Sequence, residues 1–416
     1  MSKIFPIQNS SACVLKWGWN TFRLYNGKSS SCHRVSPEFV PIEQFDQFHN
    51  MPKVLEDRAL MRKGEWPSGR GCEYCSDVEQ NNGLSDRLYH NQLPGQAPVD
   101  FGESDYVTPS ISEIYLDNTC DLACVYCIPD FSSKINQELN VFGPNIIGLK
   151  NITKVADSDK YLESYLDWLD KNSQSLTRIS ILGGEPLLQK KMWVLLDFLK
   201  TKQNPNLELA INTNLNAPES TVQQYVDTVK ELILSKSIKR ADIRGSLDCT
   251  GPQAEFIRYG VNPDRWQKNF EYLSRHKWLN LSIHQVIMSL SIKTINEFQG
   301  QITAWKKINP RITQGFFTVD GPNYEIYHPE IFGSSFFIDQ LSTLANNFIC
   351  MTDHDNICKD RLIGIINVLA NSKIDHTRLK KLLLTLDQID QRRNTSWRAL
   401  WPEIEEFFIE QKIQNF

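Results

Sequence analysis

The sequence predicts an α/β protein with a parallel sheet, preceded by a cysteine-bearing segment and followed by a helical region. From about residue 112, short β-rich runs alternate with longer amphipathic segments, and this alternation is typical of βαβ units. From about residue 335 the pattern becomes all-helical, and a separate set of cysteines lies in the first 105 residues. These observations divide the chain into residues 1–105, 106–334 and 335–416.

The periodicity of apolar residues predicts the individual elements. A strand over 21–25 followed by Asn26-Gly27 indicates a β-hairpin in the first segment. Six strands are expected in the middle segment, over 113–117, 178–182, 207–212, 242–247, 281–288 and 314–319. Helices are expected between them over 160–171, 187–200 and 222–234, and in the last segment over 337–345, 360–369, 376–386 and 397–411.

Composition limits the classes of partner. The chain has 416 residues, enough for a large core, with 23% charged residues and a formal net charge of -4. There is no overall positive field that would favour nucleic acid, although a local basic patch stays open. No secretory signal and no run of about 18 apolar residues is present, which predicts a cytoplasmic protein without a membrane span. Ten cysteines in such a chain indicate metal ligation in a reducing compartment.

Three cysteines with tight spacing carry the strongest signal for function. Cys120, Cys124 and Cys127 form a C-x3-C-x2-C pattern, with Tyr126 before the last of them. A [4Fe–4S] cluster normally takes four cysteine ligands, so a local set of three leaves one iron for a substrate or cofactor. A structural zinc site completed by a distant thiolate, or unrelated core thiols, are the alternatives.

A second motif lies one βα unit further along the chain. Residues 178–186 read R-I-S-I-L-G-G-E-P, where Gly183 and Gly184 let the backbone approach a ligand closely. Glu185, before Pro186, suits a bound ammonium group. With the cysteine triplet, this sequence resembles the GGEP motif of the radical S-adenosylmethionine (SAM) superfamily.

The resemblance implies both fold and cofactors. It implies a partial (βα)6 barrel similar to a TIM barrel, with SAM chelating the fourth iron of the triplet's [4Fe–4S] cluster through its amine and carboxylate. An external flavodoxin or ferredoxin is then expected to deliver the electron. Because chemistry in α/β barrels lies at the carboxyl ends of strands, we expect further SAM contacts there. The expected SAM-binding residues are Tyr126, Gly183, Gly184, Glu185, Pro186, Asn212, Asn214, Ser246 and Asp248.

Taken singly, the asparagines and the serine after these strands are also common turn formers. Cys249 follows Asp248 at the expected mouth of the barrel and is a candidate hydrogen-atom donor, or a small residue in a tight turn. Arg244, Arg258 and His284 lie on or near the fourth and fifth strands and are candidate contacts for an anionic ligand, with solvated or structural roles as the alternative.

A second cysteine set precedes the predicted barrel. Cys13, Cys32, Cys72 and Cys75 supply four thiols, the number that closes a cluster. With the predicted hairpin, this set resembles the twitch module, a shortened relative of the SPASM domain that carries an auxiliary [4Fe–4S] cluster. Zinc or no metal are the alternatives. A closed cluster here would serve as an electron relay or a structural staple.

Three functional hypotheses follow. The leading one is a radical SAM enzyme that forms a 5′-deoxyadenosyl radical and oxidatively modifies a peptide or protein side chain. The second is dehydrogenation, epimerisation or rearrangement of a small polar metabolite, such as a sugar, nucleotide or amino acid. The third, of another class, is a non-catalytic iron–sulfur or zinc-binding scaffold.

Overall fold

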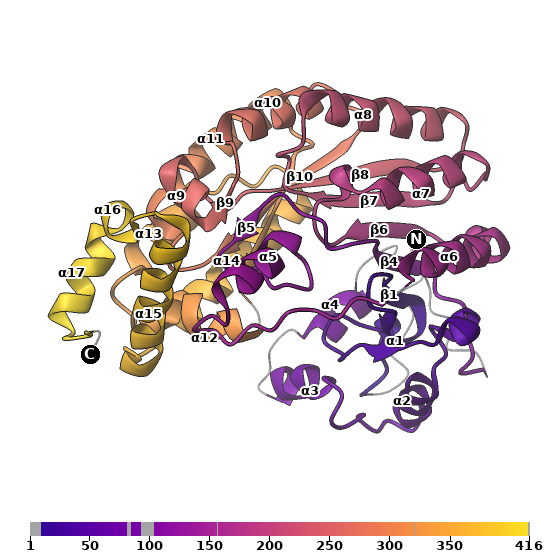
Figure 1. The fold of residues 1–416 in the computed structure, drawn as a ribbon, viewed down its shortest axis with the longest axis horizontal. Coiled ribbons are helices and arrows are strands. Elements are labelled where there is room, and N and C mark those ends of the chain that lie inside the picture. Colours follow the sequence, from indigo (N-terminus) through magenta and orange to yellow (C-terminus); the bar gives the residue numbers. More distant parts are fainter. Residues whose placement is uncertain (1–9, 81–84, 93–103, 156, 320, 415–416) are drawn as a thin grey trace. The chain divides into compact units, whose positions relative to one another are not determined.

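The computed structural model describes residues 10–80, 85–92, 104–155, 157–319 and 321–414. The chain divides into two compact units, which interleave along the sequence (Figure 1). Unit 1 comprises Met1–Asp117, Thr153–Ile211 and Thr228–Ala241, and unit 2 comprises Asn118–Ile152, Asn212–Asp227 and Asp242–Phe416.

Unit 1 is built on a mixed sheet. Its strands lie in the order β7-β6-β4-β1-β2-β3. β7 pairs with β6, β6 with β4, and β4 with β1, all in parallel, whereas β2 pairs antiparallel with β1 and with β3. The central residues of β6 are buried in succession, as expected for a parallel strand covered on both faces. The strands are β1 (Trp19–Arg23), β2 (Lys28–Ser30), β3 (Glu38–Phe39), β4 (Ile111–Tyr115), β6 (Arg178–Leu182) and β7 (Glu208–Thr213).

The N-terminal hairpin is present as predicted. Arg23 of β1 lies opposite Lys28 of β2, and Gly27 in the turn has a φ of 64°. A Cβ atom at Gly27 would lie 2.7 Å from the Tyr161 hydroxyl, so both the turn and the packing require glycine. The parallel pairing of β1 with β4 was not expected, and it makes the hairpin an extension of the sheet.

The helix predicted over 160–171 is present as α6 and buries one of its faces. In α6 the side chains of Tyr161, Tyr165, Trp168 and Leu169 are all buried, and the Trp168 ring packs edge-on against Phe48, with centroids 4.9 Å apart. The helices of this unit are α1 (Val14–Gly18), α2 (Pro52–Arg62), α3 (Glu73–Gln80), α4 (Asp86–Gln92), α6 (Ser158–Asn172) and α7 (Lys190–Lys200), while α8 (Glu219–Leu234) has residues in both units.

Unit 2 has its own parallel strands. Its strands lie in the order β11-β10-β8, and β10 pairs in parallel with both neighbours. A separate two-stranded sheet joins β5 and β9 antiparallel. The strands are β5 (Ala123–Cys124), β8 (Arg240–Ser246), β9 (Arg258–Tyr259), β10 (Asn280–Ile287) and β11 (Thr313–Thr318). The helices before residue 335 are α5 (Ser133–Phe142), α9 (Gly251–Ile257), α10 (Pro263–Ser274), α11 (Ile295–Ile308) and α12 (Tyr324–Tyr327).

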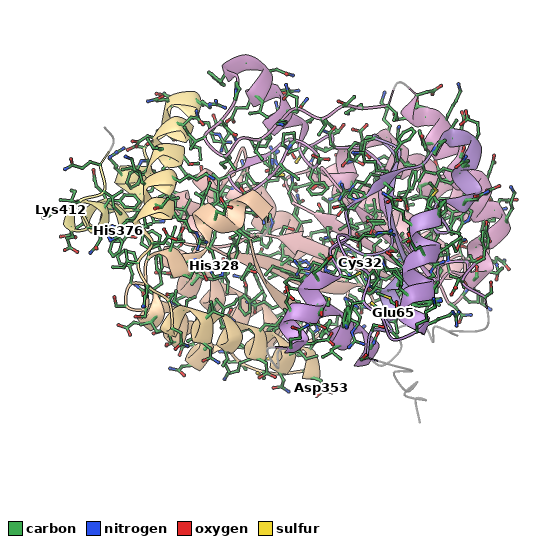
Figure 2. The ribbon with its side chains drawn as sticks, turned by 90° about the horizontal axis from the view of Figure 1, so that it is seen from below. Cys32, Glu65, His328, Asp353, His376 and Lys412 are labelled. Atoms are coloured by element: carbon green, nitrogen blue, oxygen red, sulfur yellow. The ribbon has the colours of Figure 1, made fainter. Side chains whose placement is uncertain are left out.

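The C-terminal region is helical, as predicted, with one correction. The predicted helix over 397–411 is two helices, because Pro402 lacks an amide hydrogen and Trp401 leaves the helical region with φ −130° and ψ 63°. His376 at the start of α15 and Lys412 after α17 mark this region in Figure 2. The helices are α13 (Ile338–Asn347), α14 (Asp353–Ala370), α15 (His376–Arg393), α16 (Trp397–Leu400) and α17 (Pro402–Glu410).

The structure confirms the α/β class and all six strands predicted after residue 105. The closure of these strands into a partial barrel, the twitch module and the three-part division of the sequence stay predictions. Within the described ranges, none of the helices combines the length and apolar character that crossing a bilayer requires.

Candidate functional site

The cysteine triplet forms one local group in unit 2. It lies on the loop that precedes α5, and part of this loop is β5, where Cys124 pairs opposite Arg258 of β9. Cys124 is buried, whereas Cys120 and Cys127 are partly exposed. The three cysteines pack in a single apolar cluster with Leu122, Tyr126 and Val261. The three thiols that the spacing brings together in sequence are thus also neighbours in space.

Two serines at the start of α5 fix the backbone of this loop. Ser132 donates from Oγ to the Leu122 carbonyl (2.7 Å) and caps α5. Ser133 donates from Oγ to the Cys120 carbonyl (3.2 Å) and accepts from the Cys120 amide (3.1 Å). The polar groups of the first cysteine's backbone are therefore satisfied within the protein.

A buried ion pair ties the loop to the carboxyl ends of β8 and β10. The Asp248 carboxylate accepts hydrogen bonds from Arg258 Nε (2.9 Å) and Nη2 (3.0 Å). The Tyr126 hydroxyl and the Val286 amide each donate to the same carboxylate at 2.9 Å. The side chains of Asp248 and Arg258 are only 1% and 7% exposed. A bidentate, charge-assisted network of this kind fixes the position of every member.

Burial dominates the electrostatics of the triplet. It raises the pKa of Cys124, against the opposing effect of Arg258, and it raises the pKa of Cys127 to about 12. Burial also works against the charge on Arg258, but Asp248, Tyr126 and Cys124 together outweigh it and the pKa of Arg258 is raised. Because thiolates are the metal ligands, metal loading must release protons from these cysteines, and the charged Arg258 offsets part of their negative charge.

Amide side chains after β7 belong to the same site. Asn214 Nδ2 donates to Asp121 Oδ1 (2.8 Å) and lies 3.9 Å from Cys120 Sγ. Asn216 Nδ2 donates to Asp121 Oδ2 (2.6 Å). The structure therefore brings the predicted Asn214 to the triplet and adds Asn216 and Asp121, which sequence reasoning missed. The alternation of asparagine at 212, 214 and 216 was the available signal.

The other predicted residues of unit 2 have varied surroundings. Asn212 Oδ1 accepts from Arg244 Nη1 at 3.5 Å, and the Ser246 carbonyl accepts from Trp266 Nε1 at 3.2 Å. Cys249 is completely buried. Asp248, expected to contact the SAM ribose, is engaged by the network described above. The SAM-binding and hydrogen-donor roles of these residues stay predictions.

The glycine-rich motif lies in unit 1, after β6. Gly183 and Gly184 have φ values of 81° and 57°, and a Cβ at Gly183 would come within 2.5 Å of the Tyr115 ring. Gln189 Nε2 donates to the Gly183 carbonyl (2.7 Å). Glu185 is completely buried and accepts from the Leu187 amide (3.1 Å), capping the turn that begins at Pro186. The motif is a tight turn with a buried carboxylate, and its expected role in SAM binding stays a prediction.

The second cysteine set surrounds one cavity in unit 1. Cys13, Cys32, Cys72 and Cys75 all line a partly open cavity of about 370 Å³. Burial raises the pKa of Cys13 to about 11 and that of Cys32 to about 12. Across the described residues, no three His, Cys, Asp or Glu side chains converge tightly enough to hold a single metal ion. The four thiols line one cavity, and the auxiliary cluster stays a prediction.

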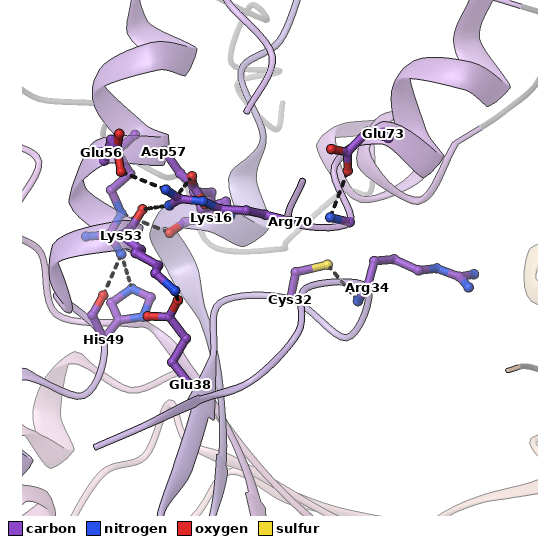
Figure 3. A network of polar contacts seen from close by, with 12 residues as sticks. Lys16, Cys32, Arg34, Glu38, His49, Lys53, Glu56, Asp57, Arg70 and Glu73 are labelled. Carbon is purple, nitrogen blue, oxygen red and sulfur yellow. Dashed lines mark hydrogen bonds and ion pairs between the residues drawn. The ribbon is translucent and has the colours of Figure 1, made fainter. Parts of the chain in front are cut away.

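Positive charges accompany this cavity. Lys16, which also lines it, pairs with Asp57 (2.7 Å), and both side chains are 2% exposed. Arg70 Nη1 donates to the other Asp57 oxygen (2.8 Å), as Figure 3 shows. Burial works against the charge on Lys16, but Cys72 and Asp57 outweigh it and raise the pKa of Lys16. The lysine is therefore a permanent cation beside four potential thiolates.

The neighbouring His49 gives this module a predicted pH dependence. His49 is 2% exposed, and its Nε2 lies 2.6 Å from the Trp17 carbonyl oxygen and 2.8 Å from Arg58 Nη2. Burial, followed by the charge of Arg58, lowers its pKa well below the ordinary value. Below about pH 6.5 the unfolded chain therefore binds a proton at His49 that the folded chain does not bind. The free energy of unfolding should decrease by about 1.4 kcal/mol for each unit by which the pH is lowered.

Chemical unfolding at several pH values between 7.5 and 5 checks this expectation. In the His49→Gln variant the free energy of unfolding should depend on pH less steeply below pH 6.5, by that amount per unit. An unchanged slope in the variant would show that His49 protonates equally in both states.

No family model and no curated protein matches the chain. Among solved structures, two crystal structures of Streptococcus suis SuiB are similar, one of them bound to S-adenosylmethionine. Each has a TM-score of 0.35, with 16% and 17% identity, and the matches cover 72% of this chain and 61% and 60% of the SuiB chains. These values are too low to establish a shared fold or function.

Proposed function

We propose that the protein is a radical SAM enzyme, in which Cys120, Cys124 and Cys127 hold a [4Fe–4S] cluster whose fourth iron binds SAM. The observation that carries this proposal is the spatial grouping of the three thiols. The Asp248–Arg258–Tyr126 network holds this group at the carboxyl ends of β8 and β10, the edge at which parallel α/β sheets bind their ligands.

Different residues have different roles in the proposed reaction. The bound cluster and SAM supply a 5′-deoxyadenosyl radical, which removes a hydrogen atom from an unactivated carbon. Asp248 and Arg258 position the triplet loop, and the loop's apolar packing around Cys124 limits the access of water. The turn at Gly183, Gly184, Glu185 and Pro186 is proposed to contribute to SAM binding.

The test is detection of the nucleoside product. After anaerobic reconstitution with iron and sulfide, incubation with SAM and a strong reductant should yield 5′-deoxyadenosine by mass spectrometry. Cys124→Ala should abolish the product, because the cluster loses a ligand. Cys358→Ala, a substitution of another buried cysteine on α14, should not.

Other products would change the conclusion. Methylthioadenosine alone would mean that a different bond of SAM is cut, and aminocarboxypropyl transfer would replace the proposal. Intact SAM in every reaction would favour the non-catalytic scaffold.

We further propose that Cys13, Cys32, Cys72 and Cys75 hold an auxiliary [4Fe–4S] cluster, in a twitch-like module. The four thiols that line one cavity support this assignment. A variant with Cys120, Cys124 and Cys127 all replaced by alanine should keep about half of the iron of the wild type. Zinc in place of that iron would overturn the assignment.

The leading reaction is oxidation of a peptide or protein side chain, since an auxiliary cluster can accept the second electron from the product radical. An external flavodoxin or ferredoxin supplies the first electron. A small polar metabolite is the alternative substrate. Incubation with size-fractionated extracts of deuterium-grown cells distinguishes the two, because deuterium in 5′-deoxyadenosine reports which fraction contains the hydrogen donor.

A further inference from the structure

Unit 2 contains a cavity that no part of the proposed function uses. It is partly open and has a volume of about 390 Å³. The triplet loop, α5, the loop that follows α5, α12 and α15 form its wall, and Cys127 is one of the lining residues. Its polar side chains include Glu138, Tyr327, Arg392 and Arg393, which come from segments far apart in the sequence.

Three buried donors on this wall lack a hydrogen-bond partner. They are the Tyr327 hydroxyl, Arg392 Nη1 and Arg393 Nη1. Tyr327 is completely buried, and the side chains of Arg392 and Arg393 are 7% and 4% exposed. A buried donor without an acceptor is uncommon and destabilising, and three around one cavity indicate the place of an acceptor supplied by a ligand.

The charges of the wall favour an anion. Glu138 accepts from Arg393 Nε (3.0 Å) and lies 2.9 Å from Arg393 Nη2, while Arg392 Nη1 is 3.9 Å from the other carboxylate oxygen. Arg392 Nη2 donates to two backbone carbonyls, which are neutral. Two guanidinium groups therefore share one carboxylate, and one positive charge is left over.

The protonation states agree with this picture. Burial lowers the pKa of Arg392, and Glu138 acts against that shift, so the buried charge gains from a further anion. Burial raises the pKa of Tyr327, so the phenol keeps its hydrogen at neutral pH and can donate it.

We propose that this cavity binds a carboxylate or phosphate group of the substrate, with Tyr327, Arg392 and Arg393 as its donors. Guanidinium groups match the geometry of such oxyanions. The inference rests on the proposed function in one respect, namely that Cys127 is a cluster ligand. Because Cys127 lines the cavity, an anion bound there would then lie beside the reacting centre. It narrows the substrate to an acidic one, whether a metabolite or a peptide.

Tyr327→Phe is the sharpest test. The substitution removes a hydroxyl that has no partner in the protein, so the folded state loses no internal hydrogen bond. Tyr225→Phe is the matched control, because its hydroxyl is also buried and unpartnered but it does not line the cavity. Calorimetric titration of the reconstituted protein with inorganic phosphate, and separately with succinate, measures affinity at constant ionic strength.

The wild type and Tyr225→Phe should bind one of these anions equally. Tyr327→Phe should bind it about tenfold more weakly, as expected for one hydrogen bond to a charged group, with an unchanged melting temperature. Arg392→Gln should weaken binding at least as much. Preference for phosphate or for succinate tells which oxyanion the substrate carries.

The inference would be overturned if the wild type bound neither anion. It would also be overturned if the two tyrosine substitutions weakened anion binding equally. A loss of SAM affinity in Tyr327→Phe would overturn it as well, because the cavity would then serve the cofactor. Since anion binding is measured without turnover, a protein that binds the anion but leaves SAM intact would contradict the proposed function and leave the cavity assignment in place.

Discussion

Replacing Asp248 with alanine is expected to destabilise the protein by about 3–5 kcal/mol, the cost of leaving one member of a buried ion pair without its partner. The Arg258 side chain is 7% exposed, so water cannot solvate its charge after the substitution. The Tyr126 hydroxyl and the Val286 amide lose their acceptor at the same time. Thermal and urea unfolding of the cluster-free protein measure the effect.

A double-mutant cycle separates the ion pair from general damage. The variant with Asp248→Ala and Arg258→Ala should be less destabilised than the sum of the two single variants, because no unpaired charge remains buried. Glu403→Ala is the control for an exposed pair: Glu403 lies 2.8 Å from Lys293, the two side chains are 40% and 32% exposed, and its loss should cost less than about 1 kcal/mol. Additive effects in the cycle would mean that Asp248 and Arg258 stabilise the protein independently.

The same variant also bears on iron binding. Tyr126 precedes Cys127, and its hydroxyl is held by Asp248. If the network positions the triplet loop, Asp248→Ala should retain less iron at the triplet than the wild type does under identical reconstitution. Unchanged iron content with reduced stability would limit the network to a role in folding.

Local patterns were sufficient to predict the six strands after residue 105 and helices such as α6, α8 and α15, whereas no range was predicted for α5, α10 or α11. The strand predicted over 178–182 matches β6 residue for residue, because the β-branched residues Ile179 and Ile181 favour a strand. The prediction of one helix over 397–411 was wrong, because periodicity does not take into account that Pro402 disfavours a helical backbone at Trp401. The parallel pairing of β1 with β4 could not be predicted, since it depends on residues about 90 positions apart in the sequence.

The candidate site shows the same division between local and distant information. The cysteine spacing predicted the triplet because its ligands lie on one short loop. For Arg258 the sequence left a ligand contact and a structural role open, and in the structure its side chain pairs with Asp248. The cavity beside Cys127 depends on Arg392 and Arg393, which come from a helix more than 250 residues further along the chain. Nothing in the local pattern of that helix distinguishes these arginines from solvent-exposed ones.

The largest effect expected at the auxiliary site comes from Lys16. A cation beside a cluster favours the reduced, more negative form, so Lys16→Met should lower the midpoint potential of the auxiliary cluster by about 50–100 mV, the size of a partly screened charge interaction. Asp57 keeps its bond to Arg70 in this variant, so the carboxylate is not left without a cation.

Redox titration followed by electron paramagnetic resonance measures this potential directly, in a variant that lacks the triplet cysteines and so contains only the auxiliary cluster. Lys53→Met is the matched control: Lys53 lies in the same module, but its side chain is 62% exposed and paired with Glu38. Because water screens the charge of Lys53, its interaction with the auxiliary cluster is weak. Its removal should therefore leave the midpoint potential unchanged. Equal shifts of the midpoint potential in both variants would mean that the effect comes from net charge. A shift confined to Lys16→Met would mean that one buried lysine sets how readily the auxiliary cluster accepts the electron from a product radical.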